Sequence, residues 1–337
     1  MTRIVSYNIL AGGYSLRENG ARRVNQLVKM IQSTNPDIVG VVEATNPILL
    51  KQKPLVIEEI AEQLGMDLIM GGEAAYVTDY QTALLTRLPV IYSKHHTRPG
   101  LLNKPLLEVC VQEEGGQELT VFVTHLAASF YQGWGGNGIR EREIEEILKI
   151  TRPHREQNLP HVIMGDFNSL APGDRFKATN LLRYVVQLDE TRNEHQPPDG
   201  HPHLNFVVPK PLRIFNPLLR IIPKSVVLSS VFDMAAALYA PRGCIRKLLE
   251  GGYSDSFRRA NPHAGGFTCP SAAPAGRIDY IFSSPALVER LESCYEITEG
   301  EGIKGNNASD HLPIAAEFST KVVLAEKNDE LKGAMIG

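Results

Sequence analysis

The stretch His161-Val-Ile-Met-Gly-Asp-Phe-Asn-Ser169 decides how the rest of the chain is interpreted. Its first four residues are mostly apolar and have no helical period, which predicts a short buried strand that stops at Gly165. Asp166 and Asn168 follow, two positions apart, and in an extended segment their side chains would project to the same side. A plain turn explains Gly-Asp-x-Asn equally well, because these are the usual turn residues. The remainder of the chain has to decide between the two interpretations.

Composition describes an ordinary globular protein. The 337 residues are 43% hydrophobic and 22% charged, which is ample for a large core. The formal net charge is −3, so no overall basic field attracts nucleic acid, and a polyanion would have to meet a local basic patch. This balance disfavours a nonspecific DNA-binding protein.

The cysteines and the start of the chain carry no metal-binding or targeting signal. Met1 leads directly into an apolar strand pattern without a charged and apolar leader, and no stretch approaches the roughly 20 apolar residues of a membrane span. We therefore expect a soluble, cytoplasmic protein, or a mature form from which a leader was removed. Because no C-x-x-C pair occurs, we expect free thiols at Cys110, Cys244, Cys269 and Cys294.

Polar side chains recur at the ends of the predicted buried strands. The predicted first strand, Arg3–Ile9, carries Asn8 near its end, and the strand Ile38–Glu43 carries Glu43 at its far end. Considered singly, each such residue is at least as well explained as a solvated strand end, and a lone histidine such as His125 is more often packed or on the surface. Together, polar groups from several strand ends can meet in a crevice at a sheet edge. The complete set is Asn8, Glu43, His125, Asp166, Asn168, Asp279, Asp310 and His311.

This set has the composition of a hard-oxygen metal site. Its carboxylates and amides suit Mg²⁺, and it lacks the cysteine or multi-histidine cluster that zinc prefers. Such a site suits hydrolysis at phosphorus, because a metal neutralises a phosphate oxygen, a carboxylate activates water, and imidazoles and amides hold the other oxygens. The residues therefore predict metal-dependent phosphoester hydrolysis.

Two glycine-rich segments predict loops of different kinds. Glu113-Glu-Gly-Gly116 joins the strands Pro105–Val111 and Glu118–Leu126 as a hairpin turn. Phe130–Gly138 holds the only tryptophan and precedes a predicted helix, Arg140–Ile150. Glycine loops that carry aromatic residues commonly line binding sites, so we expect this second loop to be near the substrate.

The region between the two central motifs predicts an insertion. Roughly 110 positions separate Asn168 from the strand Arg277–Phe282, far more than an ordinary connection. That strand alternates polar and apolar residues, which predicts a half-exposed strand. We expect a single domain over 1–320, an insertion at about 185–250 and a loose tail at 321–337. Within the insertion, the proline-broken, apolar and basic stretch Pro211–Lys224 either packs as a lid on the body or contacts substrate or membrane.

The strand-end motifs occur in the order found in a known superfamily. By these motifs the chain resembles the endonuclease/exonuclease/phosphatase superfamily, which has the DNase I-like fold. The resemblance implies an α/β four-layer sandwich, with two mostly antiparallel central sheets and helices outside. The motifs are Ser6-Tyr-Asn-Ile-Leu10, Val41-Val-Glu43, Thr124-His-Leu126, Gly165-Asp-Phe-Asn-Ser169, Arg277-Ile-Asp-Tyr280 and Ser309-Asp-His-Leu-Pro313.

The resemblance also implies a metal site. Glu43 would be the main ligand, with Asn8 and Asp310 close by. The expected ion is Mg²⁺, with Mn²⁺ as the alternative.

The resemblance further implies the catalytic roles of five residues. Asp166 would orient or deprotonate the attacking water, and Asn168 and His125 would bind the scissile phosphate. Asp279 would hold His311 in the tautomer that donates towards phosphate or bears the developing charge. Whether Asp166 or His311 is the general base stays open at this level.

The substrate is a phosphoester whose identity the superfamily leaves open, because the fold is shared by enzymes with different substrates. Our first choice is an Mg²⁺-dependent phosphodiesterase acting on a nucleic acid, a nucleotide or a lipid phosphodiester. The second is a phosphomonoesterase acting on a small or lipid-linked phosphate. The third is a noncatalytic binding protein that keeps the fold. A noncatalytic protein is expected to lack some of the strand-end residues, and none of them is missing from this sequence.

Overall fold

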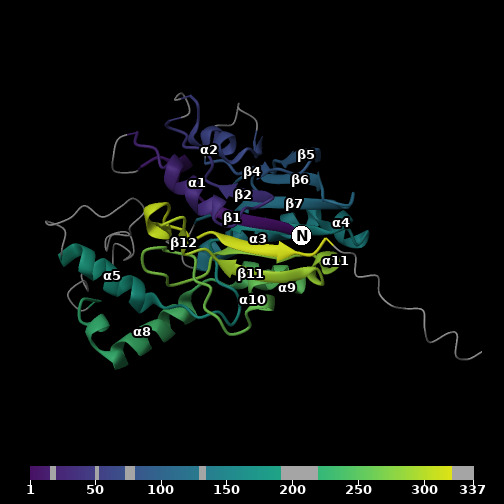
Figure 1. Cartoon of the computed structure of the whole chain (residues 1–337). Helices are drawn as coiled ribbons and strands as arrows, with labels where there is room; N and C mark the ends of the chain where they lie inside the picture. Colours follow the sequence, from purple (N-terminus) through teal and green to yellow (C-terminus); the bar gives the residue numbers. More distant parts are fainter. Residues whose placement is uncertain (16–19, 50–52, 73–79, 129–133, 191–218, 321–337) are drawn as a thin grey trace, which may run out of the picture.

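The structure is a computed structural model that describes residues 1–15, 20–49, 53–72, 80–128, 134–190 and 219–320. Its centre consists of two six-stranded sheets (Figure 1). The strands of the first sheet, in spatial order, are β11 (Leu291–Glu296), β14 (Ile314–Phe318), β1 (Thr2–Asn8), β2 (Ile38–Val42), β4 (Ala83–Thr86) and β3 (Asp67–Met70).

The second sheet contains the strand of the Gly-Asp-x-Asn motif. Its strands, in spatial order, are β5 (Val90–His96), β6 (Leu106–Gln112), β7 (Glu118–His125), β8 (His161–Asp166), β10 (Asp279–Ser283) and β9 (Ser254–Asp255). In the two sheets β1 and β2 are parallel, as are β7 and β8, and the other described neighbours are antiparallel. The predicted pair of mostly antiparallel central sheets is confirmed.

Helices cover the outer face of each sheet and complete four layers. Helices α1 (Val24–Gln32) and α2 (Val56–Leu64) share one hydrophobic cluster with the first sheet. Helices α3 (Trp134–Ile150) and α9 (Gly243–Glu250) share another with the second sheet. A third cluster fills the space between the sheets. Central strands such as β2 and β8 are buried on both faces, which is why their sequences are nearly continuous apolar runs.

The two-residue period of a strand assigns its side chains to these layers. In β1, Val5 and Tyr7 point to the helices, whereas Ile4 points to the layer between the sheets. In β8, Val162 and Met164 point to the same inner layer. Asn8 and Asp166 continue the inner-layer positions at the ends of these strands, so the same alternation that builds the core aims both polar groups between the sheets.

The remaining described elements are short or lie at the margins. No helix in the described residues is long and apolar enough to cross a membrane. The elements are η1 (Ala11–Gly13), α4 (Arg152–Glu156), α5 (Ala178–Glu190), η5 (Ile222–Lys224), α8 (Val226–Tyr239), α10 (Ser256–Ala260), α11 (Pro285–Val288), β12 (Glu299–Gly300), β13 (Ile303–Lys304) and η6 (Gly305–Asn307).

Residues 191–218 and 321–337 lie outside the described residues. Much of the predicted insertion, residues 211–218 of the apolar stretch and the predicted tail fall within them.

The predicted aromatic loop differs in part from expectation. Helix α3 begins at Trp134, so the second half of Phe130–Gly138 is helical, and residues 129–133 lie outside the described residues.

The insertion region has a small core of its own. Leu182, Val185 and Val186 of α5 form a cluster with Leu219, Ile222 and Phe232. Figure 1 shows α5 and α8 side by side, away from the two sheets. The described end of the stretch Pro211–Lys224 therefore packs on α5 and α8.

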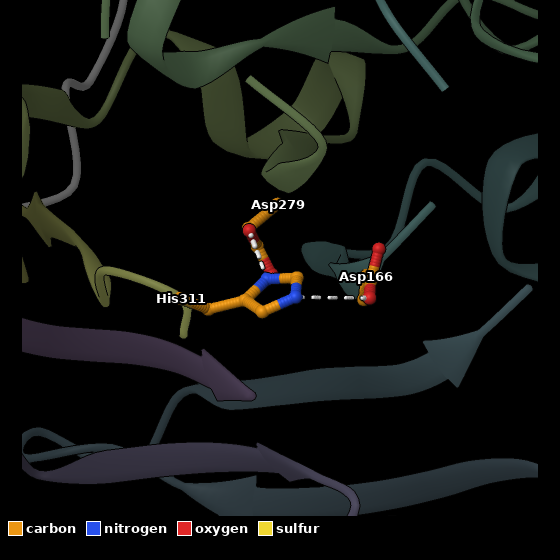
Figure 2. Close-up of side chains that lie close together, drawn as sticks. All are labelled: Asp166, Asp279 and His311. Carbon is orange, nitrogen blue, oxygen red and sulfur yellow. Dashed lines mark hydrogen bonds and ion pairs between the residues drawn. The ribbon is translucent and has the colours of Figure 1, made fainter. Parts of the chain in front are cut away.

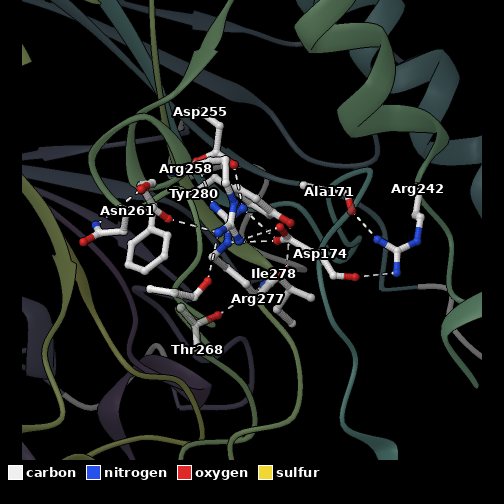
Figure 3. A network of polar contacts seen from close by, with 12 residues as sticks. Ala171, Asp174, Arg242, Asp255, Arg258, Asn261, Thr268, Arg277, Ile278 and Tyr280 are labelled. Atoms are coloured by element: carbon white, nitrogen blue, oxygen red, sulfur yellow. Dashed lines mark hydrogen bonds and ion pairs between the residues drawn. The ribbon is translucent and has the colours of Figure 1, made fainter. Parts of the chain in front are cut away.

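The prediction of a half-exposed strand at Arg277–Phe282 is wrong. Strand β10 is buried throughout, and Arg277 is completely buried. Its guanidinium forms ion pairs with Asp174 and Asp255, at 2.7 and 2.6 Å (Figure 3). The polar position in the alternating pattern marks a buried ion-pair network, since a buried charge is tolerated when it is paired and hydrogen-bonded. The guanidinium carbon also lies 4.5 Å from the centre of the Tyr280 ring.

Candidate active site

The register of the second sheet brings three of the predicted site residues together. His125 at the end of β7 is paired with Asp166 at the end of β8, and Asp166 is paired with Asp279 at the start of β10. Because β7 and β8 are parallel and β10 is antiparallel to β8, two strand ends and one strand start meet at one edge. All three residues are buried. At Gly165 a Cβ atom would collide with the carbonyl oxygen of Thr124, so the approach of β7 to β8 requires glycine before Asp166.

His311 lies between two of these carboxylates (Figure 2). Its Nδ1 is 2.8 Å from Oδ2 of Asp279, and its Nε2 is 3.9 Å from Oδ2 of Asp166. Burial by itself lowers the pKa of His311, but Asp279, Cys269 and Asp310 act against it, and the pKa lies well above 6.5. The carboxylates around the ring therefore favour its imidazolium form, which is held by Asp279 and faces Asp166.

Asp166 is oriented by two hydrogen bonds. Its Oδ1 accepts the backbone N–H of Asn168 at 2.9 Å, and its Oδ2 accepts Nδ2–H of Asn8 at 3.1 Å. Burial, opposed by His311 and reinforced by Asp279, raises the pKa of Asp166 to about 7. This carboxylate is therefore suited to accept a proton near neutral pH.

The expected extended geometry from Asp166 to Asn168 is not found. Asn168 has a φ of 48°, in the left-handed region, and its Nδ2 donates to the carbonyl of Leu126 at 3.0 Å. The chain turns directly after β8, so the two side chains are placed by the turn and not by strand alternation. Asparagine adopts this conformation more readily than most residues. Asn168 is buried beside Asp166 even so.

A second left-handed turn orders the end of β1. Leu10 and Ala11 have φ values of 55° and 52°, and Glu43 has a φ of 55°. These rare conformations aim the N–H of Leu10 at Oδ1 of Asn8, at 3.1 Å, and the N–H of Ala11 at Oε2 of Glu43, at 2.7 Å. Backbone strain of this kind persists where the surrounding structure enforces it, and it is concentrated at functional sites.

Glu43, Asn8 and Asp310 provide oxygen donors of the kind that a hard cation needs. Burial raises the pKa of the Asp310 carboxyl, His311 lowers it, and the negative charge of Glu43 raises it further. In the described part of the chain no lysine or arginine lies within ion-pair distance of either carboxylate. Two repelling carboxylates and an amide oxygen fit Mg²⁺ or Mn²⁺, which would relieve this repulsion.

Asp166, Asp279 and His311 also present candidate ligand atoms within 4.8 Å of one another. One ring nitrogen of His311 is already bound to Asp279, so Nε2 is the ring atom left to contact an ion. The described residues therefore offer two sets of candidate metal ligands, this trio and the group Glu43, Asn8 and Asp310.

Lys104 is a site residue that the sequence did not reveal. Its Nζ lies 2.7 Å from Nδ1 of His125, while Nε2 of His125 lies 3.7 Å from Oδ2 of Asp166. Burial, followed by the positive charges of Lys104 and His311, lowers the pKa of His125 well below 6.5. His125 is consequently neutral at the pH at which His311 is charged. Lys104 precedes a strand among ordinary loop residues, so no local signal distinguishes it.

Replacing Lys104 with methionine is expected to raise the pKa of His125, because the largest nearby positive charge is removed while the apolar part of the side chain is retained. An NMR titration of the His125 ring in the two proteins measures this directly. Lys149→Met, on the exposed side of α3, is the matched control and should leave the titration of His125 unchanged. Identical His125 titrations in wild type and Lys104→Met would show that Lys104 does not control this ring.

A two-sheet sandwich with carboxylates, amides and imidazoles gathered at one sheet edge defines a protein of the DNase I-like class. The model of the Endonuclease/Exonuclease/phosphatase family matches residues 5–311. The chain belongs to this family, whose members include nucleases and phosphatases, and membership supports metal-dependent phosphoester hydrolysis. A comparison with curated proteins gave no match.

Solved structures share the fold at low sequence identity. An AP endonuclease from Archaeoglobus fulgidus is 16% identical with a TM-score of 0.57, covering 95% of this chain and 100% of its own. A 3′ phosphatase from Neisseria, bound to a product DNA hairpin, is 17% identical with a TM-score of 0.54 and the same coverage. A 3′-5′ exonuclease from Neisseria meningitidis is 17% identical with a TM-score of 0.55, covering 94% of this chain and 100% of its own.

Proposed function

We propose that this protein is an Mg²⁺-dependent hydrolase of phosphodiesters. The observation that carries the proposal is the row of His125, Asp166 and Asp279 in adjacent register positions, with His311 held between the two carboxylates. The row combines a carboxylate that titrates near neutral pH, a neutral imidazole and an imidazolium. Family membership and the fold of nucleases and phosphatases support the same reaction class.

In this proposal Asp166 is the general base. A base works best when its pKa is close to the working pH, and Asp166 has a pKa of about 7. His311 is protonated under the same conditions, so it donates a proton or a hydrogen bond and does not accept one. Asp279 holds the imidazolium in place through Nδ1, which leaves Nε2 directed towards Asp166.

Asn168 and His125 are proposed to hold the scissile phosphate. His125 is neutral and buried, and Lys104 adds a positive charge beside it. Asn168 is fixed by its bonds to Leu126 and Asp166. Donors that are already ordered stabilise the charge that develops on phosphate oxygens without reorganising.

Glu43, Asn8 and Asp310 are proposed to hold Mg²⁺, with Mn²⁺ as an alternative. The bound ion would neutralise charge on the phosphate. Glu43 is positioned by the N–H of Ala11, and Asn8 by the N–H of Leu10. These bonds leave further oxygen lone pairs on both side chains for a cation.

The test of the proposed function is turnover of two chromogenic substrates, bis-p-nitrophenyl phosphate and p-nitrophenyl phosphate, each with Mg²⁺, Mn²⁺ or EDTA. We expect the diester to be the better substrate and EDTA to abolish its hydrolysis. A preference for the monoester would make the protein a phosphomonoesterase. Full activity in EDTA would contradict the metal requirement, and no turnover of either ester or of a panel of nucleotide, oligonucleotide and lipid phosphodiesters would favour a binding protein.

Replacing Glu43 with glutamine is expected to weaken Mg²⁺ binding by at least about tenfold, because the proposed carboxylate ligand becomes a neutral amide. Even the loss of a residue that only supports a ligand typically costs about that much affinity. Isothermal titration calorimetry with MgCl₂ measures the affinity of each protein. Glu156→Gln, an exposed glutamate on α4, is the matched control. Equal Mg²⁺ affinities for wild type and Glu43→Gln would remove Glu43 from the metal site.

A further inference from the structure

Helix α8 presents an apolar face to solvent. Residues 227, 231, 234 and 238 follow the 4-3-4 spacing that places side chains along one side of a helix. We call these four residues the apolar face of α8. Large contiguous apolar surfaces that stay exposed in a folded chain mark interaction sites. The exposed fractions are 71% for Val227, 53% for Val231, 62% for Met234 and 80% for Leu238, and the neighbouring Val226 is 85% exposed.

The opposite side of α8 is packed and carries the only charge of the helix. Asp233 accepts the backbone N–H of Thr179 at 2.6 Å, and the carbonyl of Ser229 accepts the Thr179 hydroxyl at 3.1 Å. Phe232 packs against the cluster on α5. The apolar face of α8 is therefore held outward by specific contacts and has no charged residue within it.

Basic residues flank this face. Arg220 and Lys224 are exposed just before α8, and Arg183 is exposed on α5. The described segment 219–225, directly before α8, carries two basic side chains, Arg220 and Lys224, and no acidic one, whereas the whole chain has a net charge of −3. An uncharged apolar helix face with a basic margin matches the layers of an anionic lipid surface, in which acyl chains lie beneath negatively charged headgroups.

The C-terminal end of α8 is joined to the loop that carries Asn168. Ser169 donates its hydroxyl to the carbonyl of Pro241 at 2.7 Å, and the N–H of Leu170 donates to the same carbonyl at 3.0 Å. Arg242 donates to the carbonyls of Ala171 and Asp174 (Figure 3). The end of α8 is thereby fixed within a few residues of the candidate active site.

We propose that the apolar face of α8, with the basic residues Arg220 and Lys224 before it, is a docking surface for an anionic lipid bilayer. With 14 residues, α8 is about 21 Å long, too short to span a bilayer, so it would lie in the plane of the interface. Docking through α8 would place the loop after β8 close to the lipid headgroups. The docking itself is independent of the proposed phosphodiester chemistry.

The test is co-sedimentation of the full chain with vesicles of phosphatidylcholine alone, or of equimolar phosphatidylcholine and phosphatidylglycerol. We expect binding to the mixed vesicles that weakens as NaCl is added, since salt screens the headgroup attraction. Val231→Ser combined with Met234→Ser should lower the partition coefficient roughly tenfold or more, because apolar surface is no longer buried in the interface. Arg220→Gln combined with Lys224→Gln should lower it about fivefold per charge on mixed vesicles only.

The matched control is Ile48→Ser, which removes an exposed apolar side chain elsewhere, 86% exposed. It should bind vesicles as the wild type does, and all variants should keep the wild-type melting temperature because the altered side chains are exposed. Absence of wild-type binding to mixed vesicles would overturn the proposal. So would equal binding by wild type and Val231→Ser/Met234→Ser. If vesicles fail to bind and sedimentation velocity shows a dimer that this double variant dissociates, the face belongs to a second copy of the chain instead.

Discussion

Asp166→Asn is expected to lower kcat/KM for a phosphodiester by roughly 10²- to 10⁴-fold, the usual contribution of a general base. Asparagine has nearly the same shape and can still accept the N–H of Asn168, so the loop after β8 is retained. It cannot take a proton from water at neutral pH. The loss should therefore appear in turnover while the architecture of the site persists.

The measurement is steady-state hydrolysis of bis-p-nitrophenyl phosphate, together with the melting temperature of each protein. Asp67→Asn is the matched control, because Asp67 is exposed at the start of β3 in the first sheet. It should leave both quantities unchanged. Wild-type turnover by Asp166→Asn would exclude Asp166 as the base and direct attention to His311.

Arg277→Met is expected to reduce the free energy of unfolding by about 3–5 kcal/mol, because breaking a buried ion pair leaves uncompensated buried charge. Nε and Nη2 of Arg277 donate to Asp174, at 3.0 and 2.7 Å, and Nη1 and Nη2 donate to Asp255, at 2.8 and 2.6 Å. Methionine would fill much of the space beside Tyr280, but it would leave the buried carboxylate of Asp255 without an ion-pair partner and Asp174 paired with Arg258 alone. Urea denaturation measures the difference.

Two further variants make this prediction specific. Arg259→Met removes an exposed arginine whose ion pair with Glu289 spans 3.4 Å, and it should cost less than about 1 kcal/mol. Adding Asp255→Asn to Arg277→Met should recover part of the stability, since the carboxylate that lost its ion pair is then neutral, while Asp174 keeps its ion pair with Arg258. A loss for Arg277→Met no larger than that for Arg259→Met would show that the network contributes little.

This network also connects stability to the site. Arg277 lies two residues before Asp279, and Asp174 lies in the loop that follows Asn168. Arg258 joins Asp174 from α10 at 2.7 Å. The ion pairs therefore hold the start of β10 and the loop after β8 at a fixed separation, on which the distance between Asp279 and Asp166 depends.

Local sequence was sufficient to predict the strands and to place most of the polar side chains at strand ends. Continuous apolar runs as short as β2 and β8 favour buried strands over helices, and a polar residue directly after such a strand lies at the end of the sheet. Glycine before Asp166 and the glycines of the β6–β7 turn mark places where the backbone needs a conformation or a close approach that side chains prevent. These are local requirements, so they are visible in a sequence.

Only the tertiary structure decides the contacts between residues that are distant in sequence. The sequence reveals Asp166, but its pKa of about 7 arises from burial and from His311 and Asp279, which only folding brings near it. Lys104 reaches His125 across 21 positions, and Asp174 reaches Arg277 across 103. An alternating pattern cannot distinguish solvent from a buried partner, so β10 was predicted to be half exposed. The outward face of α8 is likewise decided by tertiary packing, because Phe232 and Asp233 pack on α5 and leave the other side of the helix exposed.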